Sequence, residues 1–188
     1  MPRLGYGKRE HVMNVMVSSL KKADKMASSD PDNAKIEFLD DPATVRRKIG
    51  EAPCSEGSMG NAVLGILRDV LIPVSELRLE RQRGQTGLNA AEGETGGSQE
   101  PFASDDAPPG TLFSVRTQTA DGEQREQHYA SYGAIEADFA AGKIQAAALK
   151  DAVANALSGV MEPVRRAYAA SAEWQRIDQL AYPVPEGE

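Results

Sequence analysis

The stretch Lys25-Met26-Ala27-Ser28-Ser29-Asp30-Pro31 contains a basic residue and two adjacent hydroxyls but no apolar run. These features predict a loop. A lysine supplies a mobile point charge, and serine hydroxyls supply hydrogen-bond donors, so such a loop suits contact with phosphate groups. We expect Lys25 to carry the charge, Ser28 and Ser29 to donate, and Met26 to pack the loop against the body. The alternative is a solvated surface loop, because lysine and serine are usually exposed.

An apolar run precedes this loop and two helical patterns follow it. Residues 11–17 (HVMNVMV) form a mainly apolar run of strand length, which is typical of a strand buried on both faces of a parallel sheet. Asp41 and Pro42 begin a helix, because aspartate is a good N-cap and proline fits the first turn. A second helix is predicted over residues 58–72, ended by Pro73.

The first of these helices carries the basic triplet Arg46, Arg47 and Lys48. Such a cluster can hold nucleic-acid phosphates, whereas the alternative is a solvated helix face.

The segment 83–110 interrupts the regular patterns. It is rich in glycine, proline and acidic residues and has few large apolar side chains, so it cannot bury enough surface to offset its ordering entropy. We predict a disordered insertion. After it, Asp121-Gly122 between extended segments indicates a hairpin, followed by helices over residues 132–141 and 145–170. A last helix should bury Trp174, Ile177 and Leu180.

Composition limits the classes of protein to consider. The 188 residues include one cysteine and two histidines, which argues against a disulfide or a structural zinc site. The formal net charge of −7 disfavours a general nucleic-acid binder, so any RNA contact requires a local basic patch. The sequence contains no apolar run of membrane-spanning length and no signal-peptide pattern. We therefore expect a cytoplasmic protein without membrane contact.

The motifs along the chain resemble those of tyrosyl-tRNA synthetases of the eukaryotic and archaeal type, which are class I aminoacyl-tRNA synthetases. The loop at residues 25–29 is similar to their KMSKS loop in its KMSSS form, with Ala27 at the position of the first serine. The resemblance continues through Val45-Arg-Arg-Lys-Ile49, Leu149-Lys-Asp-Ala-Val153 and Met161-Glu-Pro-Val-Arg165. It covers nearly the whole chain except residues 83–110.

The resemblance implies a mainly α fold in three parts. Residues 1–40 would be the last strand and KMSKS loop of a truncated Rossmann-like catalytic domain. Residues 41–82 and 111–188 would form a helical-bundle anticodon-binding domain with a small β-hairpin. Residues 83–110 would be the disordered insertion.

The resemblance also implies an activity: ATP-dependent attachment of tyrosine to its tRNA. Lys25 would be the catalytic residue, stabilising charge on the leaving pyrophosphate, and Lys25, Met26, Ser28 and Ser29 would bind ATP. ATP would act with magnesium in the full enzyme, and no cofactor is expected to bind tightly to this chain alone. Because the sequence lacks a HIGH-type motif, we expect no tyrosine activation by this chain by itself.

Contacts to tRNA(Tyr) would come from the basic triplet and from the start of the long helix. The predicted tRNA-binding residues are Arg46, Arg47, Lys48, Gln145 and Lys150. Ala148 stands where the family has the aspartate that holds the first anticodon base.

A separate catalytic half is a second potential partner, and no family-type homodimer is expected. The alternative reading is a free-standing, non-catalytic relative that binds RNA or protein.

Overall fold

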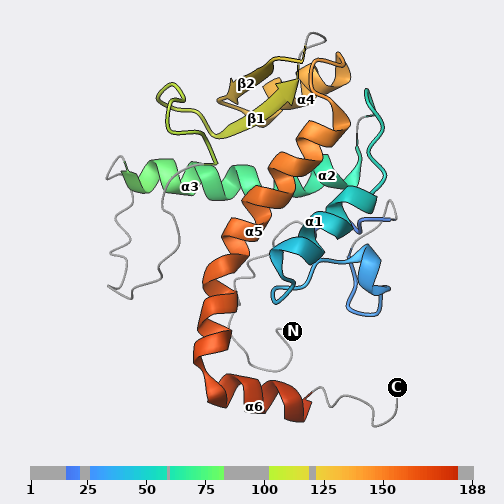
Figure 1. The fold of residues 1–188 in the computed structure, drawn as a ribbon, viewed down its shortest axis with the longest axis vertical. Helices are drawn as coiled ribbons and strands as arrows, with labels where there is room; N and C mark the ends of the chain where they lie inside the picture. The colour runs from blue at the N-terminus through green and yellow to red at the C-terminus, as the bar shows by residue number, and fades with distance from the viewer. Residues whose placement is uncertain (1–15, 22–25, 59, 83–101, 119–121, 182–188) are drawn as a thin grey trace, which may run out of the picture.

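The computed structural model describes residues 16–21, 26–58, 60–82, 102–118 and 122–181. Most of the strand predicted over residues 11–17 lies outside this range, as does Lys25. The described part contains six α-helices and one two-stranded antiparallel sheet (Figure 1).

Helix α1 (Pro42–Glu51) begins as its sequence predicts. Asp41 is the N-cap, and its carboxylate accepts a hydrogen bond from the backbone N–H of Thr44 at 2.8 Å. Val45 and Ile49 are buried one turn apart on the same face. The helix therefore has one face in the core and presents Arg46 and Arg47 on the other.

The second helical region is longer than predicted. Helix α2 (Ala62–Ile66) passes into the π-helical segment η3 (Leu67–Leu71) and then into α3 (Ile72–Gln82). Pro73 thus does not end the helix. Proline lacks a backbone donor and its ring crowds the preceding turn. The Ile72 N–H donates to the Leu67 carbonyl, so the bonding register widens just before the proline and accommodates it.

The predicted hairpin is present as β1 (Phe113–Gln118) and β2 (Gln124–Tyr129), with Phe113 paired with Tyr129 and Gln118 with Gln124. Disorder was predicted for the whole of residues 83–110, and this is wrong for its described end, residues 102–110. Phe102 forms a bridge with Phe113, and the Ser114 N–H donates to the Phe102 carbonyl at 2.9 Å. Phe102 anchors this end to the hairpin, although the average composition of residues 83–110 does not predict such an anchor.

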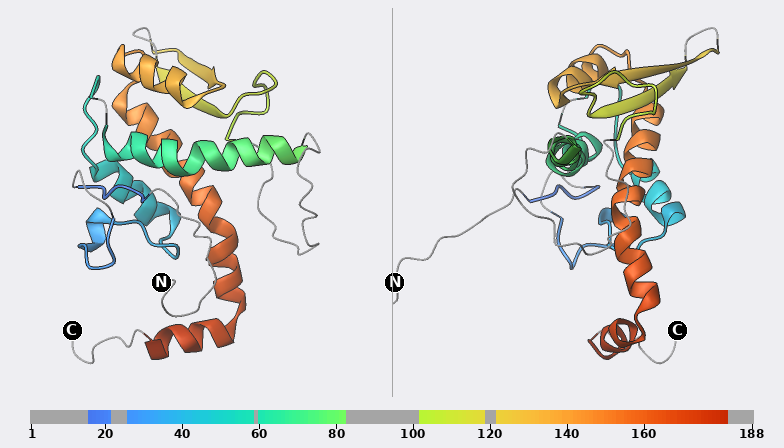
Figure 2. Two further views of the ribbon diagram at one scale, coloured as in Figure 1. Left: turned by 180° about the vertical axis from the view of Figure 1, so that it is seen from behind. Right: turned by 90° about the vertical axis from the view of Figure 1, so that its left-hand side faces the viewer.

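Helices α4 (Tyr132–Ala140), α5 (Ala146–Ala170) and α6 (Ala172–Ala181) complete the chain. The Ser131 side chain caps α4 as predicted, by accepting from the Ala134 N–H. The buried face predicted for α6 is wrong: Trp174, Ile177 and Leu180 are exposed, Leu180 by 71%. Helix α6 lies at the far end of α5, away from the core, and so has little surface to pack against (Figure 2).

The elements cross one another, and they do not form a bundle of parallel helices. The α2–α3 helix lies across α5, and the hairpin with α4 sits at the N-terminal end of α5 (Figures 1 and 2). Leu20 and Ala34 are buried, and Leu20 belongs to the same core cluster as Ile49 and Leu157. The described part of residues 16–40 therefore packs into the same core as the helices.

None of the helices in the described ranges is both long enough and apolar enough to cross a membrane.

Candidate functional site

The candidate site is the segment from Met26 to Phe38, which follows the predicted phosphate-binding lysine. Backbone bonds attach its start, since the Met26 N–H donates to the Val17 carbonyl at 2.8 Å. A tight turn follows, in which the Ala27 N–H donates to the Asp30 carboxylate at 3.0 Å. Ser28 and Ser29 lie in this turn and are exposed, so both hydroxyls can reach a ligand.

Met26 has the packing role expected for it. It is partly buried against the core, and its sulfur accepts a hydrogen bond from the Ile36 N–H at 3.4 Å.

A second lysine reaches this turn. The Lys35 ammonium donates to the Ser28 carbonyl at 2.9 Å and pairs with Glu37 at 2.9 Å. Sequence reasoning placed no functional role on Lys35, because ten residues separate it from Lys25 and only the folded turn brings it beside Ser28. The structure thus places a cation at the serine turn independently of Lys25.

An apolar cavity of about 580 Å³ lies beside this turn. Its lining combines Met26, Ala27 and Ser28 with Ile66 of α2 and Met161 of α5. Phe38, which also lines the cavity, is 73% exposed. The serine turn therefore stands at the edge of a hollow with apolar walls.

The basic triplet of α1 divides into buried and exposed members. Lys48 is fully buried, and its ammonium donates to Asp32 at 2.7 Å and to Asp40 at 2.9 Å. Burial lowers the pKa of Lys48, but the hydrogen bonds that its ammonium donates to both carboxylates outweigh this effect and leave the pKa raised. Lys48 thus has a structural role, as the cation of a buried ion pair. Its predicted contact with tRNA phosphate is corrected accordingly, because a phosphate cannot reach it.

Arg46 and Arg47 remain at the surface. Arg46 donates to the Asn155 side chain of α5 at 2.7 Å, and Arg47 pairs with Asp32 and Glu51, each at 3.4 Å. These exposed pairs are weak enough to exchange for a phosphate.

Gln145 and Lys150 lie at the start of α5, close to other elements. The Gln145 side chain donates to the Gln118 carbonyl at 3.2 Å, and the Lys150 ammonium donates to the Gly50 carbonyl at 2.8 Å. The lysine bond links α5 to the C-terminal end of α1 and uses one of its three N–H donors. The structure therefore brings Arg46, Arg47 and Lys150 to neighbouring parts of the surface, whereas Ser28 and Ser29 lie on a separate turn.

The family described as "tRNA synthetases class I (W and Y)" matches residues 1–162. The chain belongs to this class I tRNA synthetase family. The match spans residue 40, and the described residues on both sides of it contribute to one core. The predicted fold class, a helical anticodon-binding domain after a catalytic remnant, is therefore wrong.

Curated relatives in this family carry the name of the tyrosine enzyme. The chain is 32% identical to the cytoplasmic tyrosine–tRNA ligase of Saccharomyces cerevisiae over 98% of its own length and 39% of that protein. It is 31% identical to the cytoplasmic enzyme of Xenopus laevis over 97% of its length and 27% of that protein. The resemblance to tyrosyl-tRNA synthetases is confirmed at the level of the family. The chain spans well under half the length of these relatives.

Solved tyrosyl-tRNA synthetases share the fold of this synthetase-family chain. The enzyme of Aeropyrum pernix aligns with a TM-score of 0.56 at 25% identity, over 86% of this chain and 36% of that one. The enzyme of Archaeoglobus fulgidus, solved with L-tyrosine, aligns with a TM-score of 0.54 at 24% identity, over 88% of this chain and 39% of that one.

The sequence resemblance predicts that ATP would act with magnesium in the full enzyme. Within the described residues of this synthetase-family chain, no group of three or more histidine, cysteine, aspartate or glutamate side chains is arranged to hold a metal ion.

Proposed function

We propose that this chain acts as part of a cytoplasmic tyrosine–tRNA ligase, in which it contributes the loop at residues 25–29 to ATP binding and an α1–α5 surface to tRNA binding. The observation that carries the proposal is the family match over residues 1–162, which includes both regions. The relatives of Saccharomyces cerevisiae and Xenopus laevis are named as cytoplasmic tyrosine–tRNA ligases, which supports the substrate and the compartment.

The proposed role of the loop follows from charge development during tyrosine activation. As pyrophosphate leaves ATP, negative charge builds on its oxygens, and donors placed there stabilise the transition state more than the ground state. Lys25 would supply the positive charge, and the exposed hydroxyls of Ser28 and Ser29 would donate. Met26 would hold the turn to the body through its partly buried side chain. Magnesium would be bound through the ATP phosphates.

The proposed tRNA surface consists of Arg46, Arg47, Gln145 and Lys150. Arginine matches phosphate geometry through paired N–H donors. The net charge of −7 means that attraction to RNA must be local, and α1 presents two exposed arginines side by side.

A salt-dependent titration of this chain with a tRNA(Tyr) transcript tests the proposal. We expect binding whose logarithmic affinity falls linearly with the logarithm of salt concentration. Replacing both arginines (Arg46→Gln with Arg47→Gln) should lower that slope by about two, since each phosphate contact contributes about 0.9. Fluorescence anisotropy at a series of KCl concentrations measures the effect.

The matched control is Arg81→Gln with Arg176→Gln, which removes the same charge from exposed positions on α3 and α6. This control should leave the slope unchanged. Equal losses in both double variants would mean that only net charge matters, and the α1–α5 surface would be rejected. Undetectable tRNA binding at about 100 μM, the weak end of ordinary non-specific affinity, would reject the tRNA role altogether.

A further inference from the structure

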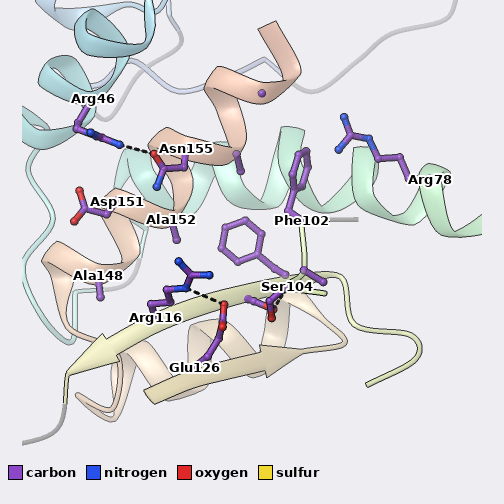
Figure 3. A pocket seen from close by; sticks show the side chains of 15 residues that line it. Arg46, Arg78, Phe102, Ser104, Arg116, Glu126, Ala148, Asp151, Ala152 and Asn155 are labelled. Carbon is purple, nitrogen blue, oxygen red and sulfur yellow. Dashed lines mark hydrogen bonds and ion pairs between the residues drawn. The ribbon is translucent and has the colours of Figure 1, made fainter. Parts of the chain in front are cut away.

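Two hollows of the molecule differ in the character of their lining. The groove between α3, β1 and α5 has a volume of about 670 Å³ and a partly polar lining (Figure 3). In that lining, Arg46 donates to Asn155 at 2.7 Å, and the guanidinium carbon of Arg78 lies 4.4 Å from the centroid of the Phe102 ring. The apolar cavity beside the serine turn is lined by fourteen residues, of which eleven are apolar. This cavity therefore has the greater tendency to be covered by another apolar surface.

The mouth of the apolar cavity exposes large side chains to water. Met16 is 60% exposed and Phe38 is 73% exposed, and both line the cavity. Met26 and Met161 contribute two further methionines, whose flexible thioether chains adapt to the shape of a partner. Contiguous apolar surfaces of this kind mark interaction sites on proteins. The cavity therefore suits an apolar protein surface.

Helix α6 presents the opposite shape. Trp174, Ile177 and Leu180 follow one another at three-residue spacing and are 42%, 51% and 71% exposed, respectively. These three residues form one apolar face, which we call the α6 stripe. Amphipathic helices dock into apolar grooves through anchors at such spacing. The chain thus carries both an apolar hollow and an apolar helix face of the kind that fills one.

The α6 stripe is held away from the cavity of its own chain. Met161 lines the cavity, and α5 continues for about 14 Å beyond it before α6 starts. Two contacts fix α6 at this far end (Figure 2): the Tyr168 hydroxyl donates to the Asp178 carboxylate at 2.9 Å, and the Tyr168 and Trp174 rings pack edge to face at 5.5 Å. No described residue of α6 lines the cavity. A contact between the stripe and this cavity therefore requires two copies of the chain.

We propose that two copies of this chain form a closed dimer, in which the α6 stripe of each copy packs into the apolar cavity of the other. A two-fold axis relates the two contacts, so each pair of surfaces is used twice and neither copy keeps an open surface. The fourteen lining residues and the ten residues of α6 reach the about 20–30 residues per partner that interfaces of standard size contain. The dimer needs neither ATP nor tRNA, so it goes beyond the proposed function.

The charged groups beside these two surfaces do not oppose the contact. At the cavity, Lys35 and Glu37 form an ion pair at 2.9 Å, so their charges offset each other. On α6, Glu173 and Arg176 stand beside the stripe with opposite charges. The net charge of −7 per chain produces a repulsion over longer distances, which added salt screens. We therefore expect added salt to strengthen the dimer, whereas it would weaken a contact held by ion pairs.

Analytical ultracentrifugation of the chain between about 1 and 100 μM tests the dimer. We expect the mass to rise from the 20.1 kDa of one chain to twice this value, with a dissociation constant of about 10 μM or below, since interfaces of standard size bind in the micromolar range or tighter. Trp174 is the sole tryptophan of the sequence, so its fluorescence should shift to shorter wavelength over the same range. A monomer at about 100 μM, or species larger than a dimer, would reject the closed dimer.

Two substitutions address the two surfaces separately. Ile177→Glu places a charge in the α6 stripe, and Phe38→Glu places one at the mouth of the cavity. Both residues are exposed, so neither change should impair folding. Each should weaken the dimer by about a hundredfold, because both symmetrical contacts lose about tenfold. A mixture of the two variants should associate more tightly than either alone, since a mixed pair retains one intact stripe and one intact cavity.

The matched controls are Leu77→Glu, at an exposed leucine of α3, and Gln179→Glu, at an exposed position of α6 outside the stripe. Neither residue lines the cavity, so both variants should dimerise like the wild type. The proposed contact would be rejected if a control weakens association as much as Ile177→Glu or Phe38→Glu does. Normal dimerisation of the Phe38→Glu chain alone would show that α6 pairs with α6, and would also overturn it. A mixture that associates no better than its components would do the same.

Discussion

Lys48 illustrates how the surroundings of one residue change its role. In sequence it is the third cation of a basic triplet on a surface helix. In the structure it is fully buried, with Asp32 and Asp40 around its ammonium group. The Asp40 side chain is only 10% exposed, so it depends on Lys48 for neutralisation, whereas that of Asp32 is 66% exposed and stays hydrated. Removing the lysine therefore leaves one nearly buried carboxylate without its cation.

We predict that Lys48→Met destabilises the fold by about 3 kcal/mol, because breaking a buried ion pair from one side leaves the other charge uncompensated. Urea unfolding monitored by circular dichroism measures the change. Arg47→Met, which removes an exposed cation one position earlier, should cost under about 1 kcal/mol. Lys48→Met combined with Asp40→Asn should recover part of the loss. A Lys48→Met variant as stable as the wild type would contradict the role of this ion pair.

At the scale of elements, Ser75 connects α3 to the segment that ends at the hairpin. Its hydroxyl donates to the Leu112 carbonyl at 2.6 Å and accepts from the Phe102 N–H at 3.3 Å. Ser75 is fully buried, so water cannot replace either bond. One side chain thus holds both ends of residues 102–112 against α3 and sets the position of Phe102 in the groove.

We predict that Ser75→Ala destabilises the chain by about 1–3 kcal/mol, since it leaves a carbonyl and an N–H buried without partners. The Phe102 amide should also exchange with solvent faster. Glu76→Ala, at the exposed neighbouring position of α3, should change neither quantity. Hydrogen exchange by NMR, together with urea unfolding, provides the measurement. Unchanged protection of Phe102 in the Ser75 variant would show that other contacts hold this segment.

For the whole molecule, titratable groups define a pH range of stability. Hydrogen bonds from Lys48, Lys143 and Arg165 lower the pKa of Asp32, Asp138 and Glu162, respectively, below their ordinary values. Burial raises the pKa of Tyr129 and Tyr132. A lowered carboxyl pKa stabilises the fold at pH values above the ordinary pKa. This stabilisation is lost as the pH falls through the pKa of the folded state. A raised tyrosine pKa stabilises the fold at pH values below the ordinary pKa of tyrosine. This stabilisation is lost as the pH rises toward the pKa of the folded state.

We therefore predict that the free energy of unfolding is nearly constant between about pH 5 and 9, and declines below about pH 4 and above about pH 10, near the ordinary pKa values of carboxylates and tyrosine. Urea unfolding across this pH series measures it. Asp32→Asn should flatten the acid side, and Tyr132→Phe the alkaline side. Constant stability from pH 5 to 2.5 would show that the carboxylate pairs do not act as described.

The local pattern of the chain determined its elements and its family. The Asp41 cap, the Ser131 cap, the hairpin and the long helix α5 all follow from near neighbours in sequence, which is why they were predictable. The KMSSS-like loop and the helical motifs likewise identify the synthetase family from the sequence alone. Local sequence patterns gave wrong predictions where tertiary packing determines the structure. The three cases are the helix that continues through Pro73, the exposed face of α6, and the end of the 83–110 segment that is anchored to the hairpin.

Only the tertiary structure decided what the charged residues do. Arg46, Arg47 and Lys48 are consecutive in the sequence. Lys48 is buried between two carboxylates, whereas Arg46 faces the groove between α3, β1 and α5, and Arg47 is exposed to solvent. Lys35 reaches Ser28, and Arg78 meets Phe102, because the fold brings distant segments together. The sequence specifies the sign of each charge, but the free energy of that charge in the folded protein depends on its burial and its partners. Those depend on contacts that form only when the whole chain has folded.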